Sequence, residues 1–196
     1  MGKEAVNMDL PSEKENYTFA DALTWGENEH IEIICGEAYM MSPPGRRHQK
    51  TSGELFGQLF NFLRDKTCEV YAAPFAVRPF AKKEDAPEDE DTLLEPDITV
   101  VCDPEKLDDY GCKGAPDMVI EILSPSTRRH DLSVKYRLYQ RAGVREYWIV
   151  DPEGKTVQVH KLEEGLYNAA EVYTCGAVPV GLWEGFSIDL DRVFAE

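Results

Sequence analysis

One short stretch, residues 116–123 (PDMVIEIL), constrains the fold more than any other part of this chain. It is almost entirely apolar, which is typical of a strand buried on both faces at the centre of a sheet. Asp117 and Glu121 are four residues apart, so their side chains face the same side of that strand. A buried strand seldom keeps a carboxylate without a partner, because desolvating an unpaired charge is costly. Glu121 therefore predicts a partner group in the middle of the sheet.

Hydrophobic periodicity predicts the elements around this strand. Helices are expected over residues 18–24, 48–66 and 131–142, the last ending near Gly143. Strands are expected at 30–35 and 37–41 (a hairpin turning at Gly36), 70–80, 94–102, 145–150, 156–162 and 170–174. This order gives a mixed β-sheet flanked by helices, an α/β (α+β) fold with an N-terminal hairpin and extra C-terminal strands. We expect a flexible tail over residues 1–17 and a single domain over residues 18–196.

Composition narrows the class of protein. The chain has 196 residues, and its charges sum to 21 − 37 = −16. No apolar run approaches the roughly 20 residues that a membrane helix needs. The polar, acidic N-terminus does not read as a secretory signal. These features predict a cytoplasmic protein without a membrane partner.

The net charge argues at first against a nucleic-acid partner, but its distribution matters more. Six acids crowd into residues 84–91, and residues 151–196 carry nine acids against three bases. By contrast, residues 40–53 contain Arg46, Arg47 and Lys50 and no acid, and residues 124–145 sum to +5. Two basic segments on an acidic body can be solvated surface or can contact phosphates.

The five cysteines stand at 35, 68, 102, 112 and 175. Their number is odd and no CxxC occurs, so a disulfide framework or a zinc ribbon is not expected. We predict reduced, mostly buried thiols.

Three residues together carry the chemical signal. Asp97 begins a strand, Glu121 lies in the central strand, and Lys135 follows on the next helix, at the border of its buried face. Carboxylates on adjacent strands repel unless a hard divalent cation neutralises them. A nearby lysine can then polarise a scissile phosphate or orient a water molecule. Each residue alone has a plain structural explanation, and only the order acid, acid, lysine is distinctive.

The segments LLEPDITVV and APDMVIEILSPSTRRHDLSVKYRLYQRAGVREYWIVDPEGKTVQVHKL, with the upstream CGEAYMMSPPGRRHQK, make the chain recognisable. The chain resembles the Uma2-like family (DUF820), whose members are assigned as endonucleases of the PD-(D/E)xK restriction-endonuclease-like superfamily. The resemblance runs from about residue 20 to the C-terminus and is densest over residues 95–162.

The resemblance implies roles for individual residues. Asp97 and Glu121 match the two acids of the nuclease motif, and with the backbone carbonyl of Ile122 they would hold Mg²⁺ or Mn²⁺. The third motif position holds Leu123, so the lysine role moves to Lys135. Two further residues, Glu37 and His48, match positions near the nuclease site and are weaker candidates.

The resemblance also implies a substrate. We expect a metal-dependent deoxyribonuclease that acts on DNA, with RNA the less favoured substrate, and a homodimer. Backbone phosphates would be contacted by Arg46, Arg47, Arg128 and Arg129. The alternative is a catalytically weak or inactive scaffold of the same fold, favoured by the acidic surface and by Leu123 in place of the motif lysine.

Overall fold

A central seven-stranded mixed sheet organises the chain. The computed structural model describes residues 14–26, 29–124, 128 and 130–195. The path of the sheet is β11-β10-β9-β8-β5-β3, with β12 also paired to β10. The strands are β3 Glu69–Ala72, β5 Ile98–Val101, β8 Met118–Ile122, β9 Glu146–Asp151, β10 Thr156–Glu163, β11 Leu166–Tyr167 and β12 Glu171–Tyr173. Only β8 and β9 pair in parallel, while every other neighbouring pair is antiparallel. The predicted mixed α/β fold is therefore confirmed.

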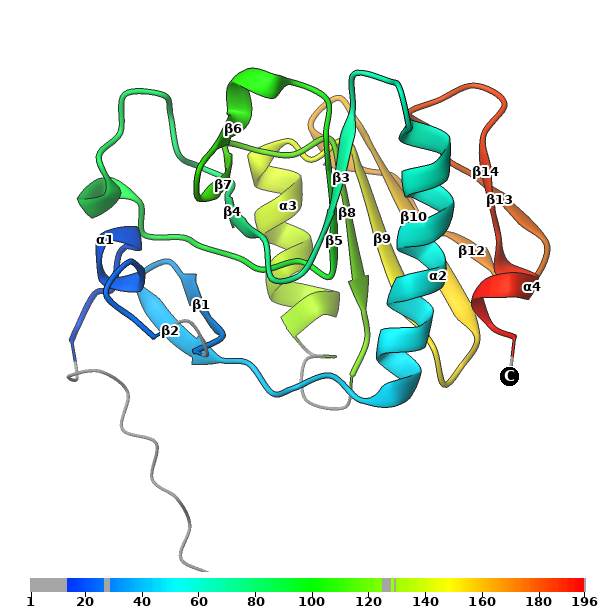
Figure 1. Cartoon of the computed structure of the whole chain (residues 1–196), viewed down its shortest axis with the longest axis horizontal. Helices are drawn as coiled ribbons and strands as arrows, with labels where there is room; N and C mark the ends of the chain where they lie inside the picture. The colour runs from blue at the N-terminus through cyan, green and yellow to red at the C-terminus, as the bar shows by residue number, and fades with distance from the viewer. Residues whose placement is uncertain (1–13, 27–28, 125–127, 129, 196) are drawn as a thin grey trace, which may run out of the picture.

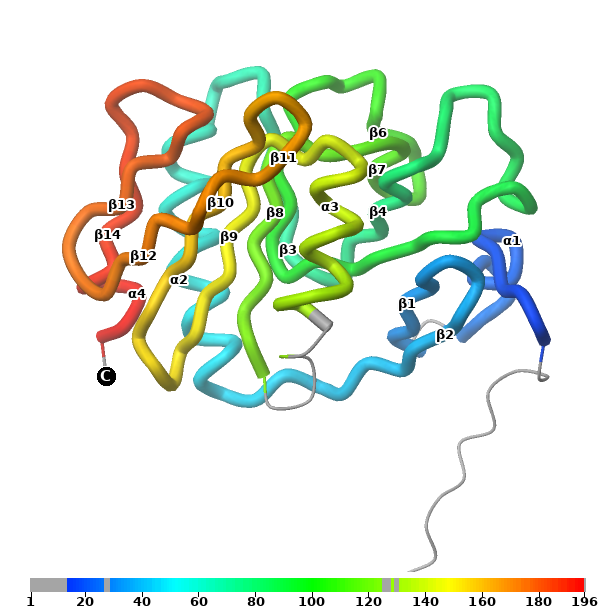
Figure 2. The backbone as a smooth tube through the Cα atoms, turned by 180° about the vertical axis from the view of Figure 1, so that it is seen from behind, coloured from blue at the N-terminus to red at the C-terminus, as the bar shows by residue number. Residues whose placement is uncertain are grey.

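Two helices cover opposite faces of this sheet, as Figures 1 and 2 show from the two sides. The long helix α2 (Arg46–Leu63) buries Leu55, Leu59 and Leu63 against alternate residues of β5, β8 and β9. Helix α3 (Tyr136–Ala142) buries Leu138 and Tyr139 against the other set. Since the side chains of a strand alternate, both faces of β8 are buried, as its apolar sequence predicts.

The boundaries of the two helices follow from the local sequence. Leucines four residues apart give α2 one continuous apolar face. A six-residue π-helical segment, His130–Lys135, leads into α3. The left-handed conformation of Gly143 (φ 92°) ends α3 at the predicted place.

The predicted strand 70–80 is wrong as one element, because the chain turns at Pro74 after a cis Ala73–Pro74 bond. Proline has no N–H to donate to a ladder, so it separates two strands. The first half is β3 of the central sheet. The second half is β4 (Ala76–Arg78), in a three-stranded sheet with β6 (Leu107–Asp108) and β7 (Gly111–Lys113). The predicted strand 94–102 likewise shortens to β5, and Leu94 makes only an isolated bridge to Val77.

The N-terminal part of the described chain packs against this small sheet. Helix α1 (Phe19–Ala22) precedes the hairpin of β1 (Ile31–Ile34) and β2 (Glu37–Met40), which turns at Gly36 as predicted. A bridge from Ile33 to Leu93 attaches the hairpin. Residues 1–13 of the expected tail lie outside the described residues, whereas Tyr17 is already buried.

The C-terminal elements pack beside α2. The chain closes with β13 (Ala177–Pro179), β14 (Ser187–Asp189) and α4 (Leu190–Val193). Two 3₁₀ turns, Pro87–Asp89 and Pro104–Lys106, lie earlier in the chain, in the loops before and after β5. No helix within the described ranges is both long and apolar enough to span a bilayer.

The cysteines differ from the expectation of reduced, mostly buried thiols. Cys68 and Cys102 form a disulfide. The last pair of the β3–β5 ladder is Glu69–Val101, and the two cysteines stand one residue beyond it on each strand. Pairing of the two strands therefore brings the cysteines together. Cys112 is buried, while Cys35 and Cys175 are exposed.

Candidate active site

The two predicted acids meet where β5 begins and β8 ends. Ile98 pairs with Ile120, and continuing that antiparallel register by one residue places Asp97 opposite Glu121. Asp97 Oδ2 accepts a hydrogen bond of 2.7 Å from the N–H of Ile122. The carboxylate of Asp97 is therefore fixed to the neighbouring strand, next to the second acid.

Both acids line one cavity of about 390 Å³. Its walls come from the segment after the hairpin, the start of α2, the turn between β3 and β4, and the two strand ends. The lining residues are His30, Met41, Ser42, Pro43, Pro44, Gly45, His48, Gln49, Ser52, Ala72, Ala73, Pro74, Glu95, Asp97, Glu121, Ile122 and Ser124. The predicted acids and Ile122 thus share a concave site of the size typical for small ligands.

Lys135 lies behind Glu121, on the α3 side of the sheet. Its side chain is 1% exposed, more deeply buried than the border position that the sequence predicts. The ammonium Nζ lies 3.1 Å from Glu121 Oε1, 2.8 Å from Glu32 Oε1 and 3.6 Å from Asp131 Oδ1. Lys135 is not among the cavity-lining residues, so its contact with the site passes through Glu121.

Two side chains donate hydrogen bonds to the same carboxylate oxygen of Glu121. Tyr139 donates its hydroxyl to Oε1 at 2.7 Å, and Lys135 donates to the same oxygen. Glu121 itself lines the cavity, so the carboxylate that these two donors hold is part of its wall.

In the part of the chain that the structure describes, three carboxylates surround the one ammonium of Lys135. Burial raises the pKa of Glu121 well above its usual range; Lys135 opposes this rise, and the negative charges of Asp131, Asp97 and Glu32 add to it. Burial alone would lower the pKa of Lys135, but Glu121, Glu32 and Asp131 outweigh it and raise that pKa. Lys135 is therefore a permanent cation shared among several carboxylates.

His48 approaches the site from the opposite face of the sheet. Its Nε2 lies 3.2 Å from Asp97 Oδ1, and it comes from the first turn of α2. Burial lowers the pKa of His48, but the hydrogen bond and charge of Asp97 more than offset this and raise it. Asp97 is thus contacted from α2, while Glu121 is contacted from the α3 side.

A second imidazole lines the same cavity. His30 Nδ1 lies 3.4 Å from Glu95 Oε2, and burial raises the pKa of Glu95. Glu95 lies two residues before Asp97, in the segment that leads into β5.

Other predicted site residues are not brought to the two acids. Glu37 is exposed on β2, accepts the Tyr39 hydroxyl and does not line the cavity. Arg46 and Arg47 are exposed at the start of α2, and Arg128 is paired with Asp151 at 3.0 Å. Arg129 lies outside the described residues.

Sequence reasoning missed Glu32. It sits in β1 between two isoleucines and is 2% exposed. The signal was available in HIEIIC, since a carboxylate inside a short apolar strand needs a partner, by the same argument as Glu121. Tyr139, in the predicted helix 131–142, was not among the predicted site residues, although its hydroxyl reaches Glu121.

The donor set favours a hard cation but is small. Asp97, Glu121 and Ile122 offer oxygens at one place, which is the chemistry that Mg²⁺ prefers, usually with several waters retained. Among the described side chains, no group of three His, Cys, Asp or Glu residues is arranged to hold a metal ion. A cation here would depend on two carboxylates, main-chain oxygen and water.

Comparison with known proteins adds three findings. A family model (Uma2), described as "Putative restriction endonuclease", matches residues 18–191. The uncharacterized protein slr1290 of Synechocystis sp. is 26% identical over 147 residues, which cover 73% of this chain and 73% of that protein. The crystal structure of "a putative nuclease belonging to DUF820" from Anabaena variabilis matches with a TM-score of 0.71 at 19% identity, covering 91% of this chain and 98% of that one. The last likeness establishes the fold.

Proposed function

This chain belongs to the Uma2 family, and from that premise we propose that it is a divalent-metal-dependent nuclease that hydrolyses phosphodiester bonds of DNA. One observation carries the proposal. Two carboxylates from adjacent strands, Asp97 and Glu121, line one cavity, and a buried ammonium, Lys135, touches the second of them.

The charge balance supports a cation at this site. Among the described residues, Lys135 is the cation shared by Glu32, Glu121 and Asp131. Asp97 is instead contacted by His48, which is charged only when protonated. Buried surplus charge is costly unless something neutralises it. Asp97, Glu121 and the carbonyl of Ile122 are the groups that would hold Mg²⁺ or Mn²⁺.

Each group has a separate task in this proposal. A divalent cation, when bound, supplies Lewis-acid stabilisation of the phosphate charge and activates water for attack. Lys135 and Tyr139 hold the carboxylate of Glu121 through Oε1, which fixes its orientation beside the cavity. Ile122 N–H and His48 orient Asp97. His48 lines the cavity as well, so its imidazole can exchange a proton or hydrogen-bond with a phosphate oxygen.

The surface places some limits on how DNA would bind. Arg46 and Arg47 are exposed in the first turn of α2, adjoining the cavity-lining Gly45 and His48, and they are the groups best placed to contact phosphates. With a net charge of −16, long-range attraction to DNA is weak. Binding should therefore be sensitive to salt.

The test is nicking of supercoiled plasmid DNA with Mg²⁺ or Mn²⁺, with EDTA as the metal-free arm. Asp97→Asn and Glu121→Gln should reduce the rate by about a thousandfold or more. Glu146→Gln is the matched control, because Glu146 is also a buried carboxylate of the central sheet but hydrogen-bonds Trp148 instead. Equal cleavage by wild type and both site variants would assign the activity to a contaminant. The same assay on RNA separates the two substrates.

A non-catalytic scaffold of this fold is the second candidate. The observation that favours it is that both oxygens of Asp97 already have protein partners, Ile122 N–H and His48. Calorimetric titration with Mn²⁺ distinguishes the two: absence of binding at millimolar concentration would favour the scaffold. Sedimentation of the same sample tests whether the chain forms the homodimer that we propose.

A further inference from the structure

We propose that Glu32, on the N-terminal hairpin, is a positioning residue of the candidate active site, which it serves by anchoring the ammonium of Lys135. This inference rests on the proposed nuclease function for its catalytic consequence, but not for the anchoring itself.

The first argument is that one oxygen of Glu32 contacts two elements of the site. Oε1 accepts a hydrogen bond of 3.0 Å from the N–H of Glu95 and lies 2.8 Å from Lys135 Nζ. Glu95 is two residues before Asp97, and Lys135 donates to Glu121. A single buried carboxylate therefore links the segments that carry both acids.

The second argument is that the ammonium of the site comes from a helix and not from the central strand. Leu123, two residues after Glu121, stands where the motif lysine would be and packs in the core on the α3 side. The ammonium therefore has to come from the neighbouring helix. A lysine side chain has four rotatable torsions, and fixing it costs conformational entropy, so a long ammonium stem needs an anchor to stay in one place. Among its carboxylate contacts, the shortest is the one to Glu32.

The third argument is burial. Glu32 is 2% exposed in a strand that otherwise holds only isoleucines, where an ionised carboxylate is costly without a cation. Glu37, on the other strand of the same hairpin, is exposed and contacts Tyr39 instead. The hairpin thus contributes one acid to the interior and one to the surface, which provides an internal control.

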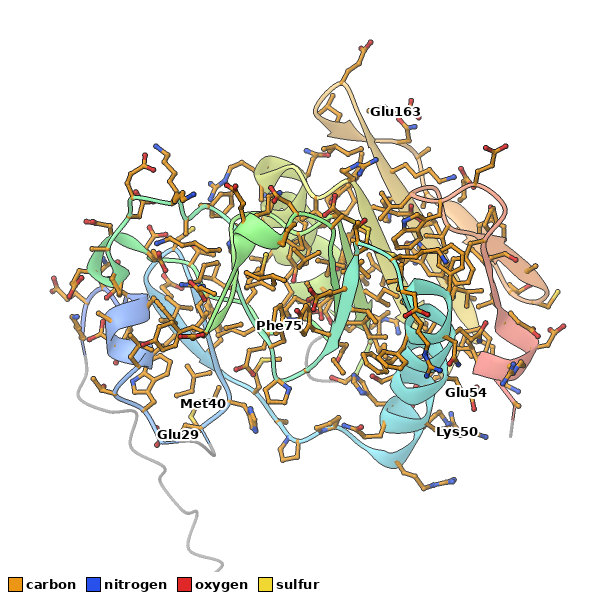
Figure 3. The ribbon with its side chains drawn as sticks, turned by 45° about the horizontal axis from the view of Figure 1, so that its top comes forward. Glu29, Met40, Lys50, Glu54, Phe75 and Glu163 are labelled. Carbon is orange, nitrogen blue, oxygen red and sulfur yellow. A yellow bond between two sulfur atoms is a disulfide. The ribbon has the colours of Figure 1, made fainter. Side chains whose placement is uncertain are left out.

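The first test measures the reactivity of the lysine amines towards an acylating reagent by mass spectrometry on the full chain. In the wild type, Lys135 should react at least about a hundredfold more slowly than the exposed Lys50 of α2 (Figure 3), because reaction of the buried amine requires local opening. Glu32→Ala should accelerate labelling of Lys135 by at least about tenfold, and Glu32→Gln by less. Glu37→Gln and Glu146→Gln should leave it unchanged.

Two results would overturn the anchoring: labelling of wild-type Lys135 as fast as Lys50, or no acceleration in either Glu32 variant. The wild-type measurement stands by itself if Glu32→Ala fails to fold. Glu32→Gln, which is nearly isosteric, supplies the second variant.

The second test concerns catalysis. Glu32→Gln should lower kcat for plasmid nicking by about tenfold with KM unchanged, and Glu32→Asp should recover part of it, since outer partners of such sites are worth about 10- to 100-fold. An unchanged kcat would overturn the positioning role. If the wild type cleaves no DNA, the proposed function fails, while the labelling result still decides whether Glu32 anchors Lys135.

Discussion

Two buried ionic clusters in this molecule differ in charge balance, and the difference separates architecture from the candidate site. In the small sheet, Arg78 binds Asp108 at 2.7 Å and Glu90 at 3.5 Å, and Lys113 binds Glu90 at 3.1 Å. Two cations there meet two acids. Around Lys135, one ammonium meets Glu32, Glu121 and Asp131.

The balanced cluster has a structural explanation. It ties β4, β7 and the acidic loop together, and none of its members lines the cavity that contains Asp97. The cluster around Lys135 adjoins that cavity and, among the described residues, brings three carboxylates to one ammonium. Perturbed, unbalanced ionisable groups beside a cleft are typical of functional sites. We infer that the acidic excess around Lys135 serves ligand binding and not stability.

The largest expected effect is on the free energy of unfolding when one charged residue of each cluster is replaced. Arg78→Met should lower the free energy of unfolding by about 3–5 kcal/mol, because it leaves Glu90 buried without its guanidinium partner. Glu121→Gln should leave stability unchanged or raise it, since burial and the surrounding acids raise the pKa of Glu121 and its charged form is the costly one at neutral pH. Urea unfolding measures both.

Lys83→Met is the control for this pair, because the Lys83–Glu105 bridge is almost fully solvated and should contribute little. A loss of stability in Glu121→Gln equal to that in Arg78→Met would contradict the distinction between the two clusters.

A smaller effect should follow from adding metal. At a Mn²⁺ concentration of 100 times its Kd, wild type should gain about 2.7 kcal/mol in unfolding free energy. Asp97→Asn and Glu121→Gln should lose that gain, whereas Arg78→Met should keep it despite its lower starting stability. Thermal unfolding with and without EDTA gives the comparison, and an equal gain in all four proteins would place the cation elsewhere.

The smallest expected effect is a pH dependence of stability caused by a group that is buried without lying in either ionic cluster. His160 is buried among the rings of Tyr136, Tyr147 and Tyr167, and burial lowers its pKa below 6.5. Its neutral form is the one that the fold favours, so its contribution is present above pH 6.5 and is lost as the pH falls towards the lowered pKa.

The stability difference between wild type and His160→Phe should therefore shrink as the pH falls from 8 to 5. Urea unfolding at the two pH values measures it. A difference that stays constant with pH would mean that His160 binds its proton equally well in the folded and unfolded chains.

Several features of the fold followed from local sequence. The central strand β8, the apolar face of α2, the glycine that ends α3 and the hairpin turn at Gly36 all depend on residues close together in the chain. The break at Pro74 was missed, although the proline itself was the signal. The Cys68–Cys102 pairing was missed because it depends on which strands become neighbours.

The candidate site divides in the same way. Asp97 and Glu121 were predicted from the order acid, acid, lysine along the chain and from the family resemblance, since each residue alone has a plain structural explanation. Glu32 and Glu37 were equally close to the expected hairpin turn, and the register Ile34–Glu37 puts both side chains on the same face of the hairpin. Only the packing of β1 against the rest of the molecule decides that Glu32 is buried while Glu37 stays exposed. The His48–Asp97 contact joins a helix and a strand that the sequence could not orient towards each other.

The sequence by itself determined the mixed sheet, because burial patterns are properties of short segments, and its motifs carried the resemblance that indicated the family. The assignment of Asp97 and Glu121 as the two site acids stays a prediction. Only the tertiary structure decided that Lys135 lies behind Glu121 and that Glu32 shares its ammonium. These contacts join the N-terminal hairpin, the central strand and a helix. The desolvation that makes such charges informative exists only after those three elements have packed together.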